Sequence, residues 1–140
     1  MNTMKLIINI PDGIVFEDDV VSLVAETDDG SFGILPMKSD CVIGLANGPI
    51  KIGCVDGTEK IAAAASGIVA VKNNVVKVIA SDFNWQEDID EKTALVTIER
   101  LKERLAHKDQ MLHREFVLAQ TAISRSEARL EALGMRKANE

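Results

Sequence analysis

The sequence predicts an N-terminal antiparallel β-sandwich in residues 1–86, followed by a C-terminal two-helix antiparallel hairpin in residues 87–140. The positions of glycine and proline predict the β domain, because all three prolines and eight of the nine glycines lie at or before Gly67. The positions of arginine support the helical part, because all six arginines lie after residue 99, in a stretch that mixes both charges. Turn-rich sequence followed by charge-mixed sequence without glycine or proline is typical of a β domain followed by helices.

The first half contains short apolar segments separated by tight turns. Asp-Gly, Asn-Gly and Asn-Asn pairs mark the turns, since these residues tolerate positive φ. Strands of this length suit a sandwich or a flattened barrel. Ala62–Ala65 is interpreted as a strand whose small side chains let another backbone approach closely. The expected strands are Met4–Ile10, Ile14–Phe16, Val20–Glu26, Ser31–Leu35, Val42–Leu45, Ile50–Val55, Glu59–Ala65, Ile68–Val71 and Val75–Ala80.

The second half opens with a helix-start signal, in which Asp88 caps the helix and Glu91 is its capping-box partner. A narrow, mostly apolar stripe then recurs at helical spacing, which favours helix-on-helix packing. Its members are Ala94, Ile98, Leu101 and Leu105, then Leu112, Phe116, Ala119, Ile123, Ser126, Leu130 and Leu133. The two sets share one register, and the polar junction 107–110 contains no glycine or proline. Two conformations are therefore open: a hairpin with Asp109 capping the second helix, or a single helix from about Asp88 to Leu133.

Composition excludes several classes of function. The net charge of −6 and the absence of tyrosine argue against a nucleic-acid platform. We expect neither a membrane-spanning segment nor an export signal, because the apolar runs are too short. Cys41 and Cys54 are expected to be reduced thiols. We find no nucleophile–base pair, no phosphate loop and no metal-ligand spacing, so no catalytic residue, metal or cofactor is predicted.

The most distinctive stretch is Gly30-Ser31-Phe32-Gly33-Ile34-Leu35-Pro36. Asp29-Gly30 is a turn signal, the apolar residues that follow suit a short buried strand, and Pro36 prevents a central strand from continuing. Local physics alone predicts a hairpin with a rigid exit.

Together with four other segments, this stretch resembles the epsilon subunit of F-type ATP synthases, whose mitochondrial counterpart is called delta. The resemblance covers the whole chain in order and spacing. Val24-Ala25-Glu26 and Asp29-Gly30-Ser31-Phe32 also resemble the epsilon-like subunit of the alternate, sodium-translocating branch (N-ATPases). The four other segments are Pro11-Asp12-Gly13-Ile14-Val15-Phe16, Ser66-Gly67-Ile68-Val69-Ala70-Val71, Val76-Lys77-Val78-Ile79-Ala80 and Asp88-Ile89-Asp90.

The resemblance implies a non-catalytic rotor subunit at the cytoplasmic face of the membrane, without insertion into it. Its partners would be the gamma subunit of the central stalk and the membrane rotor ring of c subunits. The chain would thereby couple ion translocation to ATP synthesis or hydrolysis in the catalytic head. In bacterial and chloroplast relatives the C-terminal helices can extend along gamma and inhibit hydrolysis. The alternative, from a different class, is a free-standing sandwich-and-hairpin adaptor without an ATPase partner.

The chain departs from the family pattern at three positions. Ser31 replaces an acidic residue, and Lys38 stands where the family usually has histidine. The resemblance places both, with Phe32, on the rotor-ring side. Some bacterial members bind ATP through an Ile/Leu-Asp-x-x-Arg-Ala string. Here Ile89, Asp90 and Ala94 match it, but Thr93 replaces the arginine and removes its cationic fork, so ATP binding is expected to be weak or absent. Arg114, Arg125 and Arg129 are candidates for contacting an acidic partner in the alpha or beta subunits of the catalytic head.

Overall fold

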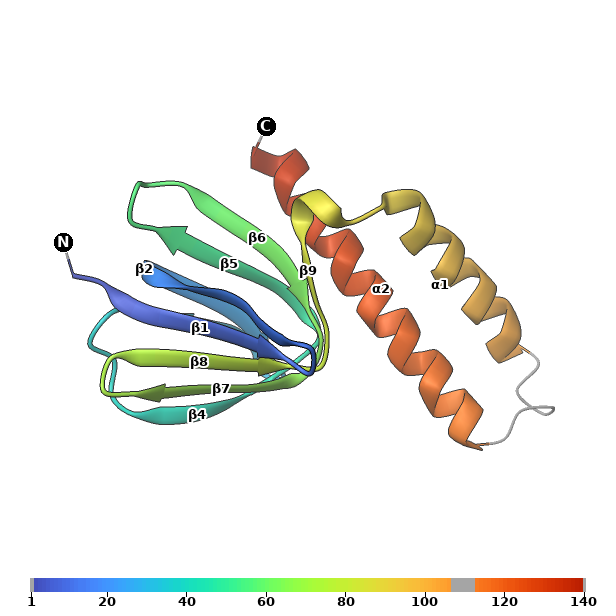
Figure 1. The fold of residues 1–140 in the computed structure, drawn as a ribbon. Helices are drawn as coiled ribbons and strands as arrows, with labels where there is room; N and C mark the ends of the chain where they lie inside the picture. Colours follow the sequence, from blue (N-terminus) through green and yellow to red (C-terminus); the bar gives the residue numbers. More distant parts are fainter. Residues whose placement is uncertain (1, 107–112, 140) are drawn as a thin grey trace.

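The computed structural model of the chain describes residues 2–106 and 113–139, and it shows the predicted β-sandwich followed by two helices (Figure 1). The strand order is β4-β7-β8-β1-β2-β5-β6-β9, with β3 paired to β2. The strands in the described residues are β1 Met4–Ile10, β2 Gly13–Thr27, β3 Gly30–Ile34, β4 Cys41–Leu45, β5 Gly48–Cys54, β6 Glu59–Ala64, β7 Gly67–Lys72, β8 Val75–Ala80 and β9 Phe83–Trp85.

Strand β2 joins the two layers of the sandwich. Up to Val20 it pairs with β1, and from Val20 onward it pairs with β5 and then also with β3. The prediction of two separate strands, Ile14–Phe16 and Val20–Glu26, is therefore wrong. The acidic residues between them, Glu17, Asp18 and Asp19, do not end the strand, because their side chains lie in solvent. Lys5 Nζ of β1 lies 3.4 Å from Glu17 Oε1.

Two further details differ from the expected sandwich. The pairing of β1 with β8 is parallel, so the sheet is not purely antiparallel. The short strand β9 also escaped prediction, because three residues are too few to show alternation. It pairs with β6 and is fixed by aromatic contacts: the Trp85 ring lies edge-on to Phe83 at 4.9 Å and to Phe16 at 5.8 Å between centroids.

Inward-facing residues of both layers form one apolar core, which follows from the alternation of side chains along each strand. Leu6 and Ile8 of β1, Val76 and Val78 of β8, and Ile52 of β5 are fully buried in it.

The alanine run of β6 explains how the helices attach. Ala62 and Ala64 face the sandwich core, whereas Ile61 and Ala63 form a second cluster with Ala132 of helix α2. The prediction of a strand with small side chains, closely approached by another element, is confirmed. The small side chains on both elements let the helix lie directly on the sheet.

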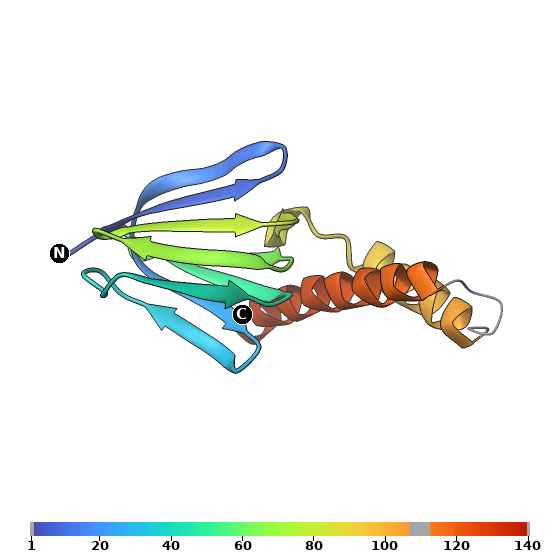
Figure 2. The same ribbon diagram turned by 90° about the horizontal axis from the view of Figure 1, so that it is seen from below.

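The helical part is a hairpin made of α1 Glu91–Ala106 and α2 His113–Asn139, preceded by the 3₁₀ turn η1 Gln86–Asp88. Figure 1 shows α2 between the sandwich and α1, with the two helices packed against each other, and Figure 2 shows the hairpin extending from the same end of the sandwich. The structure thus has the hairpin, not the single long helix. The junction 107–110, including the Asp109 cap, lies outside the described residues.

The predicted N-cap at Asp88 is wrong, as is the capping box with Glu91. Asp88 ends η1, and Ile89 that follows is extended, with φ −85° and ψ 127°. Helix α1 begins after Asp90, whose Oδ1 accepts hydrogen bonds from the backbone N–H groups of Lys92 and Thr93 at 3.0 and 3.3 Å. The cap therefore lies two residues later than the sequence signal indicated.

Candidate functional site

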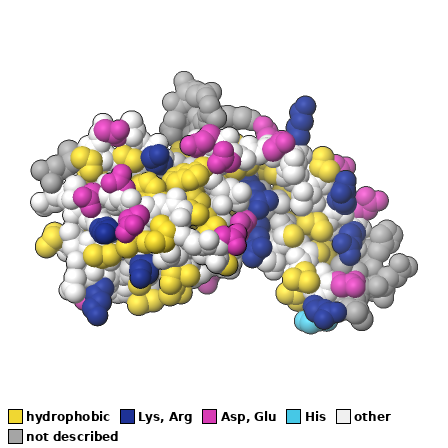
Figure 3. All heavy atoms as spheres, in the orientation of Figure 1, with side chains coloured by type: hydrophobic (Ala, Val, Ile, Leu, Met, Phe, Trp, Pro, Cys, Tyr) yellow, Lys and Arg dark blue, Asp and Glu magenta, His cyan; other side chains and the backbone are white. Residues whose placement is uncertain are grey.

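Exposed apolar side chains lie on the outer face of the sheet formed by β4, β7, β8 and β1, beside polar residues such as Lys77. Val42, Ile68 and Ile79 are large hydrophobic residues on it, with exposed fractions of 71%, 41% and 44%. Cross-strand register places Ile68 between Gly44 and Ile79, and Ala70 between Val42 and Lys77. We call this surface, defined by Val42, Gly44, Ile68, Ala70 and Ile79, the outer β4–β8 face. Figure 3 shows hydrophobic side chains gathered over β1, β8 and β7.

Sequence reasoning did not identify this face, although a signal was present. Strand β7 is apolar on both sides: Val69 and Val71 point into the core, while Ile68 and Ala70 point outward. A strand that is half exposed in an antiparallel sheet normally alternates apolar with polar residues. Because β7 does not alternate, its outer side is suited to contact with another protein.

The predicted ring-side residues Ser31, Phe32 and Lys38 come together at the open edge of the sandwich. The Ser31 hydroxyl donates to Glu26 Oε1 at 2.7 Å. The Phe32 ring is half buried against the core, and Lys38 Nζ lies 4.7 Å from its centroid. This distance is within the range of a cation–π contact.

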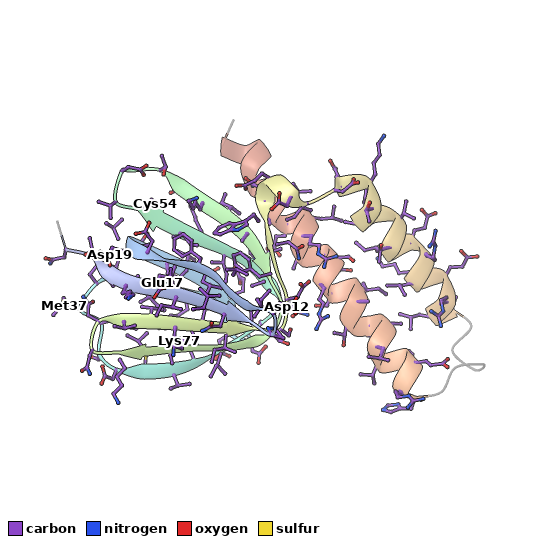
Figure 4. The ribbon with its side chains drawn as sticks, in the orientation of Figure 1. Asp12, Glu17, Asp19, Met37, Cys54 and Lys77 are labelled. Atoms are coloured by element: carbon purple, nitrogen blue, oxygen red, sulfur yellow. The ribbon has the colours of Figure 1, made fainter. Side chains whose placement is uncertain are left out.

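The loop after β3 is fixed by hydrogen bonds to distant segments. Met37 has a φ of 67°, which is uncommon outside glycine, and its N–H donates to Asn74 Oδ1 at 2.7 Å. The Asn74 Nδ2 in turn donates to the carbonyl of Thr3 at 2.8 Å. In Figure 4, Met37 lies at the end of the sandwich opposite Asp12 and the helices. The positive φ of Met37 belongs to this anchored turn, and the Met37 side chain is exposed.

The three predicted arginines occupy different environments. Arg129 Nη2 contacts Asp82 Oδ2 at 2.8 Å, and Arg125 Nη2 donates to Ser81 Oγ at 3.3 Å, so both lie between α2 and the sandwich. Arg114 is exposed in the first turn of α2. It lies eleven residues before Arg125, about 16 Å along a helix. The structure therefore groups Arg125 with Arg129 and separates Arg114 from them.

The residues that match the nucleotide motif serve the start of α1. Asp90 caps the helix, and the Thr93 hydroxyl donates to Asp90 Oδ2 at 3.0 Å. The hydrogen bond from the Thr93 hydroxyl is the main reason that the pKa of Asp90 lies below its ordinary value, and the bond from the Thr93 N–H is the second. Ala94 is buried, and Ile89 packs against the cluster under α2. Asp90 is thus already engaged within its own chain.

Within residues 2–106 and 113–139, no three His, Cys, Asp or Glu side chains are grouped to hold a metal ion. Both cysteines, Cys41 and Cys54, are free thiols. Neither described helix is long and apolar enough to cross a bilayer.

The chain is thus a β-sandwich with an exposed apolar face and an attached helical hairpin, an arrangement suited to contact with other proteins. The family described as "ATP synthase, Delta/Epsilon chain, beta-sandwich domain" matches residues 3–86. The ATP synthase epsilon chain of Clostridium kluyveri is 31% identical over 93% of this chain and 96% of its own length. That of Bacillus licheniformis is 32% identical over 94% and 98%, respectively. This chain belongs to the ATP synthase epsilon chain family, and it is a non-catalytic subunit of the central stalk of an F-type ATP synthase.

The fold agrees with solved structures of low sequence identity. A chain of the Euglena gracilis mitochondrial ATP synthase superposes with a TM-score of 0.81 at 18% identity, over 95% of this chain and 82% of that one. A chain of the Tetrahymena thermophila mitochondrial ATP synthase central stalk and c-ring gives a TM-score of 0.59 at 16% identity, over 93% and 96%. These likenesses concern the fold alone.

Proposed function

We propose that the chain couples rotation of the membrane rotor ring to the catalytic head, with its sandwich held between the ring and the gamma subunit of the central stalk. Family membership supports this role over that of a free-standing adaptor. The observation that carries the proposal is the outer β4–β8 face, whose apolar residues lie in solvent in the isolated chain. We assign this face to gamma.

The ring side is proposed at Ser31, Phe32 and Lys38. Two observations support rigidity there: the Lys38–Phe32 contact and the bond from Met37 to Asn74. A coupling element has to transmit torque, so its contact loops need to be fixed to the sandwich rather than free. In this arrangement the chain is peripheral, at the cytoplasmic face of the membrane.

The proposal gives the two parts of the chain different roles. Residues 1–86, the sandwich, couple ring rotation to the catalytic head, and residues 87–140, the helices, regulate ATP hydrolysis. Several hydrophobic residues remain exposed on the hairpin, among them Leu95 and Val96 of α1 and Leu118 of α2. These side chains would be covered if the helices moved onto gamma or onto the alpha and beta subunits of the head. Arg114, exposed on α2, is our candidate for an acidic partner there.

The gamma assignment is tested by capture of a gamma subunit on immobilised variants. Ile68→Asp combined with Ile79→Asp places two charges on the outer β4–β8 face and should abolish capture. Val24→Asp combined with Val55→Asp is the matched control, because these exposed side chains lie outside the outer β4–β8 face and outside the helices. It should capture gamma as the unmodified chain does. Full capture by the sheet variant, with circular dichroism showing both proteins folded, would reject the assignment.

A further inference from the structure

Three links of two residues each carry the chain from one layer of the sandwich to the other, at the end that faces the helices (Figure 1). One layer contains β4, β7, β8 and β1, the other contains β5, β6 and β9, and β2 belongs to both. In chain order the links are residues 46–47 between β4 and β5, 65–66 between β6 and β7, and 81–82 between β8 and β9. We call them the first, middle and last crossing links.

The crossing links are hydrogen-bonded to one another. The Ser66 N–H donates to Asn47 Oδ1 at 2.6 Å, and the Ser66 carbonyl accepts the N–H of Ser81 at 3.1 Å. The Ala65 N–H donates to the carbonyl of Asp82 at 2.9 Å. The middle link is thus joined to both of the others, and the contacts among the three links determine how the two layers meet at this end.

Helix α2 contacts the first and the last crossing link. At the last link, Arg125 and Arg129 make the contacts with Ser81 and Asp82 described above. At the first link, Asn47 Nδ2 donates to Ser124 Oγ at 2.9 Å. Both ends of the Asn47 amide are therefore engaged, since its oxygen holds the middle link and its nitrogen holds the helix.

We propose that docking of α2 stabilises the junction between the two layers of the sandwich. The docked helix connects the first crossing link to the last, so that loosening one link requires loosening the others. Asn47 is the positioning residue of this arrangement, because it contacts the helix and the middle link at once. While the helix is docked, this end of the sandwich is more rigid than when the helix has left.

The docked state is not fully satisfied. The buried Nε of Arg125 has no hydrogen-bond partner among the described residues. An unpaired buried donor raises the free energy of the docked state, so the helix can leave at a moderate cost. The rigidity of the sandwich is therefore open to change by whatever draws α2 away.

The inference goes beyond the proposed function and rests on it only for its meaning in the complex. There the sandwich has to transmit torque, and a sandwich whose helices have moved onto another subunit would lack this support. Departure of the helices would then weaken coupling through the sandwich itself, in addition to any contact that the helices make elsewhere.

Amide hydrogen exchange on the full chain tests the inference with Ser124→Ala combined with Arg129→Ala. The reporters are the amides of Ala65, Ser66 and Ser81, whose acceptors all belong to the sandwich. Faster exchange at these amides must therefore be transmitted from the helix through the crossing links. We expect it to rise by about fivefold, the effect of losing a typical net hydrogen-bond contribution, together with faster exchange in α2.

Two controls separate this effect from a general loss of stability. The Cys54 and Gly57 amides are bonded within the turn between β5 and β6, and Figure 4 shows Cys54 at the end of the sandwich away from the helices. Their exchange should not change. Arg114→Ala combined with Thr121→Ala truncates two side chains of the same helix, one exposed and one bonded within α2, and should leave every reporter unchanged.

The inference is overturned if α2 exchanges faster in the Ser124 and Arg129 variant while the three reporters keep their rates. It is equally overturned if α2 keeps its own rates, since the polar contacts would then not hold the helix on the links. Capture of gamma tests the outer β4–β8 face, so its outcome and that of the exchange experiment are independent.

Discussion

Arg129 of α2 and Asp82, which lies between β8 and β9, are joined over 2.8 Å from Nη2 to Oδ2. The two side chains are about one-third exposed, at 32% and 35%. Two further polar contacts lie along the same helix, from Asn47 Nδ2 to Ser124 Oγ at 2.9 Å and from Gln86 Nε2 to the carbonyl of Ala132 at 2.7 Å. The apolar part of this junction is small and rich in alanine. Helix α2 is therefore held on the sandwich by a small apolar contact together with a few polar contacts.

Arg129→Ala is expected to loosen α2 from the sandwich without unfolding either part. The pair is partly exposed, so the loss should be on the order of 1 kcal/mol. Hydrogen exchange of the α2 amides should accelerate, whereas exchange in β1 and β8 should stay slow. Arg114→Ala removes an exposed arginine of the same helix and should have no such effect. Equal exchange in the two variants would show that the Arg129–Asp82 pair does not hold the helix.

Removal of the helices tests whether they regulate the complex. A chain ending at Asp88 keeps every described strand. If the helices inhibit, complexes assembled with it should hydrolyse ATP faster than complexes with the full chain. A crosslink that holds α1 and α2 in the closed hairpin should raise hydrolysis in the same way. Unchanged hydrolysis in both cases would assign the helices a structural role.

Gly67→Ala is expected to destabilise the sandwich. A Cβ at this position would overlap the carbonyl oxygen of Ile79 and lie 2.8 Å from its carbonyl carbon. The backbone of β8 cannot move aside without disturbing its pairing with β1, so about 1–3 kcal/mol of stability should be lost. Gly44→Ala is the control, because its Cβ would meet nothing within 4 Å. Thermal unfolding should distinguish the two variants, and equal midpoints would contradict the close approach.

Much of the fold could be predicted because turn residues and apolar alternation are local. Met4–Ile10 and Val75–Ala80 were predicted with the bounds that the structure shows. The errors arose where tertiary contacts decide. Strand β2 passes from one layer to the other because its partner changes from β1 to β5. Strand β9 forms because it pairs with β6 and its Trp85 ring contacts Phe16. The cap moved from Asp88 to Asp90 because an extended residue follows η1.

The candidate sites divide in the same way. Ser31, Phe32 and Lys38 were predicted together from the family resemblance, and their ring-side role stays a prediction. The outer β4–β8 face could not be predicted, since Val42 and Ile79 become neighbours of Ile68 and Ala70 only through the sheet register. Arg125 and Arg129 were candidates for an acidic partner in another subunit, but their contacts with Ser81 and Asp82 depend on where α2 docks.

The isolated chain is expected to bind ATP weakly or not at all. Thr93 offers no cationic fork for phosphate, and its hydroxyl is already bonded to Asp90. Arg129 is paired with Asp82. Isothermal titration calorimetry with magnesium ATP should therefore give no saturable heat in the submillimolar range. Sub-millimolar affinity would contradict this expectation, whereas a gain of affinity in Thr93→Arg would identify position 93 as the cause.

The N-cap of α1 is expected to depend on pH through Asp90. The hydrogen bond from the Thr93 hydroxyl is the main reason that the pKa of Asp90 lies below its ordinary value of 3.8. A lowered pKa means that the fold favours the charged carboxylate. Its contribution is complete above pH 3.8 and is lost as the pH falls through the lower pKa of the folded state. Acidification in that range should fray the first turn of α1.

Amide exchange or carbon chemical shifts at Lys92 and Thr93 would report this fraying. Asp90→Ala should show it at neutral pH, because no oxygen remains to accept the two N–H groups. Asp90→Asn keeps an acceptor but does not titrate, so its first turn should lose the pH dependence. Asp88→Ala should leave the first turn as it is, since Asp88 lies in η1. Fraying in Asp88→Ala, with an intact turn in Asp90→Ala, would return the cap to the position that the sequence signal indicated.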